Sequence, residues 1–292
     1  MSISRNSVDH LQRVRHANDS IRVRPLISIV IASRNSGGTL EQCLDSILSQ
    51  QFREWEIVVV DGGSEDSTLD LLRKRGSRIN YWQSAKDHGI CHAWNTALQH
   101  ITGQWILFLG ADDYLWSAET LERAVPYLQS AYPRHLVVYG NVAAANRNGE
   151  IISIIGSQWI ELERRMRRTM ALPHQGVFHH RSLFKHYGLF DETFRIMGDY
   201  EFLSRFIWEH PPQYMPGVTV AAWRQGGMSM QVRNLRTVAA ERLRVSNRKN
   251  SHRGSPFLSI VYAEEFARMV TRLLLGDRVM RRLQKVYRNA VD

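Results

Sequence analysis

The feature that most constrains the fold is a regular alternation of short apolar runs and helix-like segments in the first 110 residues. The apolar runs cover residues 26–32, 55–60, 79–82 and 104–109. Between them, apolar side chains recur at helical spacing in residues 39–50, from 66 or 67 to 72, and in 88–100. This order predicts β-α-β-α-β-α-β, which is typical of an α/β fold with a parallel sheet covered by helices on both faces.

Polar loops follow three of the four predicted strands. They are Ser33-Arg34-Asn35, Asp61-Gly62-Gly63-Ser64 and Asp112-Asp113. The carboxyl ends of parallel strands share one edge of the sheet, where open α/β sheets bind ligands, so we expect these loops to converge. The Gly62-Gly63 pair permits close approach of a flat or phosphorylated ligand, and Asp61 can accept from a base N–H or a ribose hydroxyl. A simple Asx turn is the alternative for Asp61.

Two adjacent carboxylates, Asp112 and Asp113, end the apolar run at residues 106–109. Neighbouring carboxylates repel each other unless a cation or hydrogen-bond donors compensate their charge. A hard divalent cation that also binds phosphate oxygens is the simplest compensator, so the pair predicts a metal–diphosphate site. The alternative is that one of them caps a short helix near residues 116–119.

Composition narrows the classes of protein. The chain has 292 residues, enough for one large domain or a domain with an appendage, and 43% of them are hydrophobic, as in a globular protein. Its two cysteines, Cys43 and Cys91, form no disulfide framework and no metal-ligand pattern. No apolar run approaches the roughly 20 residues that span a bilayer, and residues 1–24 lack the apolar core of a secretory signal. We therefore expect a cytoplasmic protein.

The net charge is +10, from 38 basic and 28 acidic residues. Nucleic acid, anionic lipid or a phosphorylated substrate would each suit this charge. Arginines cluster at residues 164–168 and basic residues again at 278–288, without interleaved aromatics of the kind that bind single-stranded nucleic acid. Acids that converge at strand ends argue against nucleic acid as a partner, and a solvated helix face remains the alternative for each cluster.

The second half of the chain is less regular. Residues 136–142 and 150–155 predict two strands around a turn that contains Asn146 and Gly149, and residues 159–170 predict a helix with an arginine face. His179 and His180 are expected on a strand surface, and Trp94 and Trp105 in the core. From about residue 255 onward the spacing of apolar residues predicts helix.

Taken in order, these motifs resemble the glycosyltransferases of family 2, a large inverting family with the GT-A fold, over residues 26–230. The resemblance to bacterial surface-polysaccharide enzymes rests on Ser28–Asn35, Ser46–Gln50, Val58–Thr68, Asp87–Ile90, Phe108–Asp113, His174-Gln175 and Gly198–Phe202. It implies a Rossmann-like, mostly parallel sheet flanked by helices. It also implies a catalytic domain at 25–235 with halves 25–121 and 122–235. The residues outside the resemblance are expected to form a basic extension at 1–24 and a helical C-terminal extension at 236–292.

The resemblance also implies a chemistry. The enzyme would move a sugar from a UDP-, GDP- or dTDP-sugar to an acceptor hydroxyl, with Mn²⁺ or Mg²⁺ as cofactor. The acceptor would be a lipid-linked glycan of an exopolysaccharide, capsule or O-antigen, and peripheral attachment to the inner face of the cell membrane is a further hypothesis.

Roles carry over residue by residue. Asp199 would be the catalytic base, and Asp112 the metal ligand, with Asp113 or His174 contributing. The nucleotide would contact Ser33, Arg34, Asp61, Asp87, Gly89, Asn95 and Ala111. Arg164, Arg165 and Arg168 would meet an acceptor phosphate or lipid. A structural histidine is the alternative for His174, and a helix cap is the alternative for Asp199.

Three positions depart from the family pattern. Gly62 replaces the second of two acids after the second strand, Gly110 replaces the first acid of Asp-x-Asp, and His92 stands where an acid is common. Fewer acids should weaken metal binding. The competing functions are a sugar-nucleotide nucleotidyltransferase, a non-catalytic relative, and a basic module that binds nucleic acid or membrane.

Overall fold

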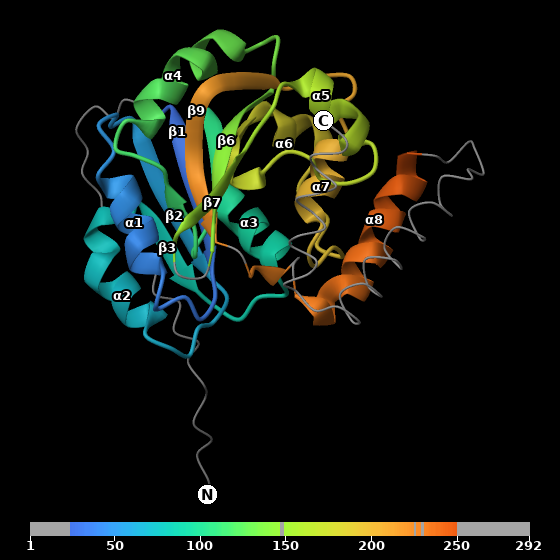
Figure 1. Cartoon of the computed structure of the whole chain (residues 1–292). Helices are drawn as coiled ribbons and strands as arrows, with labels where there is room; N and C mark the ends of the chain where they lie inside the picture. Colours follow the sequence, from blue (N-terminus) through green and yellow to red (C-terminus); the bar gives the residue numbers. More distant parts are fainter. Residues whose placement is uncertain (1–23, 147–148, 225, 229–230, 250–292) are drawn as a thin grey trace, which may run out of the picture.

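The computed structural model describes residues 24–249, apart from 147–148, 225 and 229–230. These residues form a nine-stranded sheet that helices cover on both faces (Figure 1). Most of the predicted basic extension, the helix predicted from residue 255 and the basic cluster at 278–288 lie outside the described residues.

The four predicted strands of the first half pair in parallel, in the order β3-β2-β1-β4. They are β1 (Ile27–Ser33), β2 (Trp55–Asp61), β3 (Tyr81–Ser84) and β4 (Trp105–Gly110). The connecting helices are α1 (Leu40–Leu48), α2 (Thr68–Arg75) with a 3-10 turn at Gly76–Arg78, and α3 (Ile90–Leu98). The predicted β-α-β-α-β-α-β order is confirmed.

The second half extends this sheet with mixed pairings. Its elements are β5 (Tyr114–Leu115), α4 (Thr120–Ala131), β6 (Val137–Ala145), β7 (Ile151–Ile155), α5 (Trp159–Met166), a 3-10 turn at His174–Gly176, β8 (Val177–His180), α6 (Ser182–Tyr187), α7 (Gly198–Ser204), β9 (Gln213–Arg224), a 3-10 turn at Val232–Asn234 and α8 (Leu235–Lys249). Because β8 is antiparallel to both β4 and β6, β6 runs in the same direction as β4. The sheet is therefore parallel in its first half and mixed overall.

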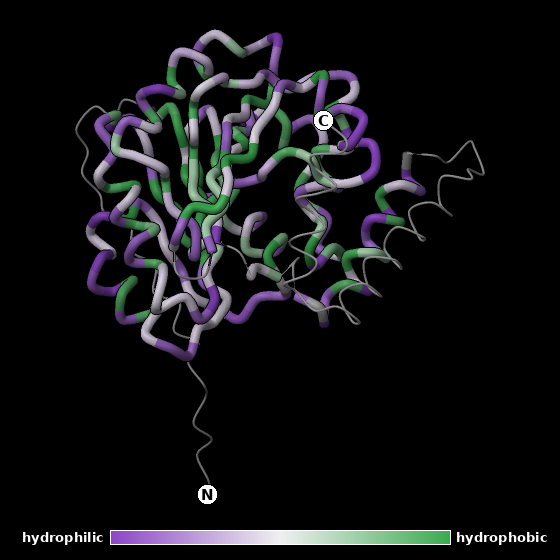
Figure 2. Tube along the Cα trace, viewed as in Figure 1, coloured by the Kyte–Doolittle hydropathy of each residue, from purple (hydrophilic) through white to green (hydrophobic). Residues whose placement is uncertain are grey.

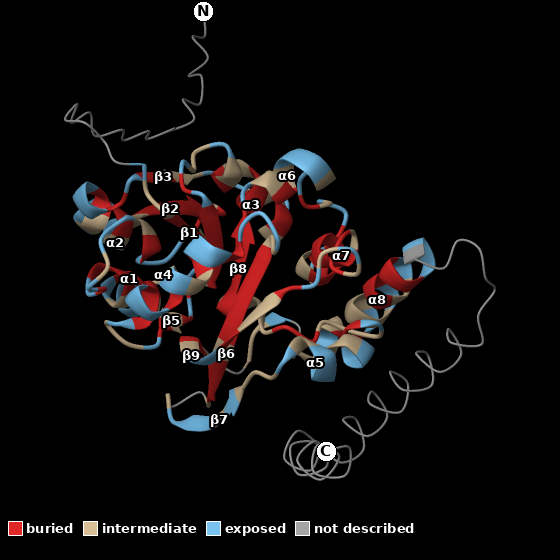
Figure 3. Ribbon diagram, turned by 90° about the horizontal axis from the view of Figure 1, so that it is seen from above, coloured by how far each residue is buried: buried red, intermediate tan, exposed pale blue. Residues whose placement is uncertain are grey.

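The core has one apolar cluster on each face of the sheet, because side chains alternate along a strand. Ile29 and Ile31 belong to the cluster under α1, α2 and α4, whereas Val30 belongs to the cluster under α3 and α7. The strands carry the hydrophobic colours in Figure 2 and are mostly buried in Figure 3. Trp94 and Trp105 are buried in this core, as predicted.

The expectation that His179 and His180 lie on a strand surface is wrong. Both belong to β8, but their exposed fractions are 0% and 8%. Since β8 lies between β4 and β6 inside the sheet, helices and loops cover both of its faces. The His179 ring packs among aromatic rings, with centroids 5.4 Å from Phe108 and 5.3 Å from His174.

The last described helix, α8, begins at Leu235, next to the predicted start of the helical extension. It packs on the segment that carries α7, because its Glu241 accepts from the Arg195 N–H and its Arg248 donates to Glu201. Within residues 24–249, no helix is both long enough and apolar enough to cross a bilayer.

Candidate active site

The strand ends converge at one edge of the sheet. Ser33 of β1 pairs with Asp61 of β2, and Asp61 pairs with Ser84 of β3. On the other side of β1, Ala32 pairs with Gly110 of β4. Neighbouring strands lie about 4.8 Å apart, so four strand ends fall within roughly 15 Å. The predicted meeting of the three polar loops at the carboxyl edge is confirmed.

Asp61 is the fully buried centre of this edge. Its carboxylate accepts hydrogen bonds from the hydroxyls of Ser33 (2.9 Å), Ser64 (2.5 Å) and Ser84 (2.7 Å), and from the N–H groups of Gly63 (3.1 Å) and Ser64 (2.8 Å). A carboxylate has roughly four lone-pair positions, so these five donors leave none of them free. Asp61 therefore fixes the loops around it, with the Asx turn included, and its direct contact with a nucleoside stays a prediction.

The loop after β1 is tied to the loop after β2. The Asn35 N–H donates to the Ser64 hydroxyl (2.7 Å), and the Glu65 N–H donates to the Asn35 side chain (2.9 Å). Asn35 adopts a left-handed backbone with φ of 50°, which asparagine tolerates better than most residues. Arg34, one residue beyond Ser33, is exposed, so its guanidinium is accessible to a ligand at this edge.

Asp87 occupies the space above Gly62. A Cβ at position 62 would lie only 2.7 Å from the Asp87 Oδ2 atom. The Asp87 Oδ1 atom accepts from the N–H of Gly89 (3.1 Å), which precedes α3 and has a φ of 127°. The missing acid at position 62 is thus replaced in space by a carboxylate from the next strand-to-helix loop.

Asp112 and Asp113 do not cap a helix, because α4 begins only at Thr120. Both carboxylates fold back over Gly110: a Cβ there would lie 2.6 Å from Asp113 Oδ2 and 2.8 Å from Asp112 Oδ1. Asp112 is exposed, whereas Asp113 has an exposed fraction of 2%. The absent side chain at position 110 therefore lets two acids approach the same point.

The environment of Asp113 favours a nearby cation. Burial, together with the negative charge of Asp112, raises the pKa of Asp113 to about 7. The Arg224 N–H (3.2 Å) and the Gln175 side chain donate to its carboxylate and oppose this rise. No group of three acids, histidines or cysteines within the described ranges is arranged to hold a metal ion. The described residues thus offer a carboxylate pair here.

His174 belongs to the aromatic core rather than to a three-ligand cluster. Its ring stacks on Phe108 at 5.7 Å and lies 5.1 Å from Trp94. Burial lowers the pKa of His174 to about 3, so the imidazole is neutral. Its Nε2 atom is buried without a hydrogen-bond partner in the described part of the chain. Its role as a metal ligand stays a prediction.

Asn95 has a structural role that the sequence did not reveal. Its amide donates to the Phe190 carbonyl (2.9 Å) and to Glu192 (2.9 Å), and its oxygen accepts from the Phe190 N–H (3.0 Å). The exposed fraction of Asn95 is 6%. These bonds use both ends of the amide to join α3 to the segment before α7, and a contact of Asn95 with a nucleotide stays a prediction.

Asp199 lies in the first turn of α7, and burial raises its pKa to about 6. It accepts from the Tyr200 N–H (2.7 Å) of the same turn, but Met197 occupies the N-cap position of α7, so Asp199 is not the N-cap residue. The preceding Gly198 lies against the Cys91 sulfur and has no room for a Cβ. Since Cys91 is two residues beyond Gly89, α3 connects the Asp87 loop directly to Asp199.

Glu241 of α8 holds the segment in front of α7, and no motif pointed to it. Its carboxylate accepts from three consecutive N–H groups, those of Arg195 (2.7 Å), Ile196 (3.0 Å) and Met197 (2.9 Å). Its exposed fraction is 4%. The other acid of α7, Glu201, is buried in ion pairs with Arg205 and Arg248 and is structural.

The predicted acceptor arginines lie around the end of α5. Arg164 and Arg165 occupy its last turn and are exposed, and Arg168 is partly exposed just beyond it. The Arg168 carbonyl accepts from the buried guanidinium of Arg242 at 3.0 Å, so α8 also fixes this segment.

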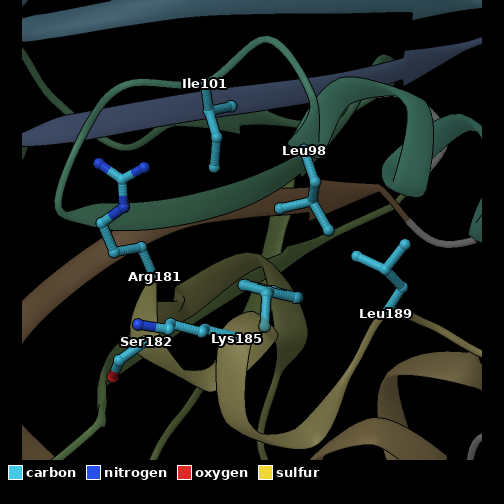
Figure 4. Close-up of a pocket in the computed structure, with 7 residues that line it drawn as sticks. Leu98, Ile101, Arg181, Ser182, Lys185 and Leu189 are labelled. Atoms are coloured by element: carbon cyan, nitrogen blue, oxygen red, sulfur yellow. The ribbon is translucent and has the colours of Figure 1, made fainter.

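A pocket of about 370 Å³ lies away from the site (Figure 4). Leu98, Ile101 and Leu189 line it, together with Arg181 and Lys185. Arg181 follows directly after β8, whose last residue His180 pairs with Trp105 at the start of β4. The pocket is therefore at the amino end of β4, opposite to Gly110.

Comparison with known proteins agrees with this geometry. The family model described as "Glycosyl transferase family 2" matches residues 28–189. A PGL/p-HBAD biosynthesis glycosyltransferase of Mycobacterium bovis is 35% identical over 217 residues, which cover 70% of this chain and 79% of that protein. The UDP-Glc:alpha-D-GlcNAc-diphosphoundecaprenol beta-1,3-glucosyltransferase WfgD of Escherichia coli is 32% identical over 136 residues, 46% of this chain and 53% of that protein.

Two solved structures share the fold. TarS of S. aureus in complex with UDP-GlcNAc has a TM-score of 0.58 at 18% identity, covering 84% of this chain and 80% of that chain. The mannosyltransferase PcManGT of Pyrobaculum calidifontis, in complex with GDP-Man and Mn²⁺, has a TM-score of 0.58 at 20% identity, covering 83% and 70%. By the extent of the family match and by the identity to the mycobacterial relative, the chain belongs to glycosyltransferase family 2 and is a glycosyltransferase.

Proposed function

We propose that this glycosyltransferase moves a sugar from a nucleotide-diphosphate sugar to the hydroxyl of a lipid-linked glycan, with inversion at the anomeric carbon. One observation carries the proposal: Asp199, a carboxyl group with a pKa of about 6, is joined through α3 to a sheet edge that bears Asp87, Asp112 and Asp113. A single displacement requires a base and a diphosphate-binding edge that are held in a fixed arrangement, and the contact of α3 with the start of α7 supports one.

The comparisons support the choice of substrates. Three solved structures with this fold are complexes, with UDP, with UDP-GlcNAc and with GDP-Man and Mn²⁺. The E. coli relative is named for an acceptor that carries diphosphoundecaprenol, which is a lipid. We therefore favour a UDP-, GDP- or dTDP-sugar as donor and a lipid-linked intermediate of a surface polysaccharide as acceptor, at the inner face of the cell membrane.

A divalent cation, Mn²⁺ or Mg²⁺, fits the carboxylates of Asp112 and Asp113. Such ions prefer oxygen ligands, and Mg²⁺ is commonly held by one or two carboxylates together with substrate phosphates. Two acids over Gly110, one of them exposed, match that pattern better than an all-protein cage. When bound there, the cation would neutralise the charge that grows on the leaving nucleotide diphosphate.

The residues of this chain supply the remaining steps. Above about pH 6 the Asp199 carboxylate is ionised. It takes the proton of the acceptor hydroxyl while the oxygen of that hydroxyl attacks the anomeric carbon. The bond between that carbon and the diphosphate oxygen breaks in the same step, and the electron pair leaves with the nucleotide. Arg34 is exposed at this edge of the sheet, where its guanidinium can bind the phosphates of the leaving nucleotide.

Calorimetric titration tests the proposal. We would titrate wild-type protein with UDP, GDP and dTDP, each with and without Mn²⁺. We expect one nucleotide to bind in a metal-dependent manner, with binding lost in Asp112→Asn and kept in Asp199→Asn, while Asp199→Asn abolishes sugar transfer. Asp70→Asn, which removes only an exposed ion pair with Arg73, is the matched control. If the wild-type protein binds none of the three nucleotides, the chain is a non-catalytic relative and the proposal is wrong.

A further inference from the structure

The edge strand β7 presents an unusual apolar surface. It has the sequence Ile-Ile-Ser-Ile-Ile and, in the described part of the chain, pairs only with β6. Ile151, Ile152 and Ile154 have exposed fractions of 43%, 53% and 55%. The strand is pale blue at the rim of the molecule in Figure 3 and hydrophobic along its length in Figure 2. Proteins usually protect an open edge strand with charges or prolines, and β7 has neither.

Helix α5 continues this surface. Three residues separate it from β7, so the strand end and the helix start lie within about 14 Å. Ile160, in its first turn, has an exposed fraction of 75%, and Arg164 follows four residues later on the same helix face. Arg165 is also exposed. Of the two acids on this helix, Glu163 is bound to Arg167 at 2.6 Å and Glu161 is exposed. Apolar and cationic side chains thus share one surface.

This surface lies beside the active site. Because β6 runs in the direction of β4, its carboxyl end, to which β7 pairs, is at the same end of the sheet as Gly110. Ile151 pairs with Ala145 of β6, and Ala145 pairs with Arg224 of β9. Two strand spacings place Ile151 about 10 Å from Arg224, whose N–H binds Asp113.

We propose that β7 and the exposed face of α5 form a docking surface for an anionic lipid bilayer. Ile151, Ile152, Ile154 and Ile160 enter the boundary between headgroups and acyl chains, while Arg164 binds lipid phosphates. This proposal rests on the proposed function in one respect, namely that the acceptor is linked to a lipid. Such an acceptor would leave the bilayer about 10 Å, or two strand spacings, from Arg224, whose backbone N–H binds Asp113.

The positive charge of the chain favours an anionic bilayer, rather than a second copy of this chain, as the partner of the docking surface. The chain carries a net charge of +10, and the arginines of α5 adjoin the isoleucines. A twofold contact through this surface would bring together two copies that each carry this net positive charge, and like charges oppose such a contact. An anionic headgroup layer complements both the apolar and the cationic parts.

Liposome co-flotation of the full-length chain tests the proposal. The vesicles would be phosphatidylcholine alone and phosphatidylcholine mixed with phosphatidylglycerol, at low and high salt. We expect wild-type protein to float with the anionic vesicles, more weakly at high salt. Partitioning should fall at least about tenfold in Ile152→Ser/Ile154→Ser and severalfold in Arg164→Ala. Leu189→Ser, a change at another exposed apolar residue (47%), is the matched control and should float as wild type.

The outcomes separate this inference from the proposed function. Equal flotation of wild type and the isoleucine variant, or no flotation of either, refutes the docking surface even if the nucleotide binds. Light scattering that shows a dimer in the wild type and a monomer in Ile152→Ser/Ile154→Ser also refutes it, in favour of a second copy. Nucleotide binding by titration should be the same in both proteins, and its absence in the wild type would count against the proposed function alone.

Discussion

Replacing Glu241 by glutamine should disturb catalysis from a helix that the family motifs do not reach. In the structure the Glu241 Oε1 atom accepts from the Arg195 N–H, and the Oε2 atom accepts from the N–H groups of Ile196 and Met197. Met197 directly precedes α7, whose first turn carries Asp199. The carboxylate therefore positions the proposed base through the backbone in front of it.

The magnitude follows from the bonds that glutamine cannot make. A glutamine keeps one acceptor oxygen, and its NH₂ group faces at least one of the three N–H donors. One unpaired donor costs about 1–3 kcal/mol, and loss of the charge weakens the remaining bonds, so we expect a loss of roughly 3 kcal/mol in the free energy of unfolding. A shift of Asp199 by about 1 Å would lower kcat by up to roughly 100-fold, whereas KM for the donor should change little.

The pH dependence gives a second, independent signature. Burial is the main cause of the raised pKa of Asp199, about 6, and the negative charge of Glu241 adds to it. Removing that charge lowers the pKa of Asp199, so the acidic limb of the kcat profile should move to lower pH. Among the other groups near this site, the Cys91 thiol has its pKa raised to about 12 and stays protonated, and Glu201 is paired with Arg205 and Arg248.

The assay is nucleotide release at 15 °C as a function of pH, with urea unfolding measured on the same samples. Glu122→Gln, an exposed acid on α4, is the control and should match the wild type in both measurements. If Glu241→Gln loses stability but keeps the wild-type kcat and pH profile, Glu241 serves only the fold and our reasoning is wrong.

Three further predictions concern the sheet edge. The raised pKa of Asp113 means that the folded state holds its proton more tightly than the unfolded state. The contribution of Asp113 to the free energy of unfolding is therefore fully present below about pH 4 and is lost as pH rises through about 7. Asp113→Asn should therefore raise the free energy of unfolding at pH 7.5 in EDTA by roughly 2 kcal/mol or more, and Tm with it, while transfer activity falls; an unchanged Tm would contradict this. Gly62→Ala should displace the Asp87 carboxylate and weaken nucleotide binding about tenfold by calorimetry, with Tm nearly unchanged; a large loss of Tm would show that the fold itself needs the glycine. Asp61→Asn leaves at least two of five donors without an acceptor, so urea unfolding should show a loss of roughly 2–4 kcal/mol, and a loss under 1 kcal/mol would refute the central role of this carboxylate.

Local pattern was sufficient for much of the fold. Strand and helix in the first half follow from apolar spacing, because burial of one face is decided within each segment. The meeting of Ser33, Asp61 and Asp112 at one edge was also predictable, since parallel strands must end together. The expectations for Asp199 and for the Asp112-Asp113 pair depended on the ordered motifs of the family.

What the local pattern did not reveal depended on neighbours distant in the chain. Asn95 and His179 have ordinary local sequences, and only the packing of Phe190 and of β8 between two strands gives them buried roles. The replacement of the acid at position 62 by Asp87 arises from a contact across 25 positions, which no local pattern encodes.

The sequence by itself determined the α/β order, the edge that carries the site and the family, because these depend on periodicity within segments and on motifs in a fixed order. Only the tertiary structure decided that Glu241 holds the segment before Asp199, that two acids share the space over Gly110, and that the isoleucines of β7 remain exposed. The physical reason is that hydrogen-bond partners, desolvation and exposure are set by which segments the fold brings together, not by the residues next to them in the chain.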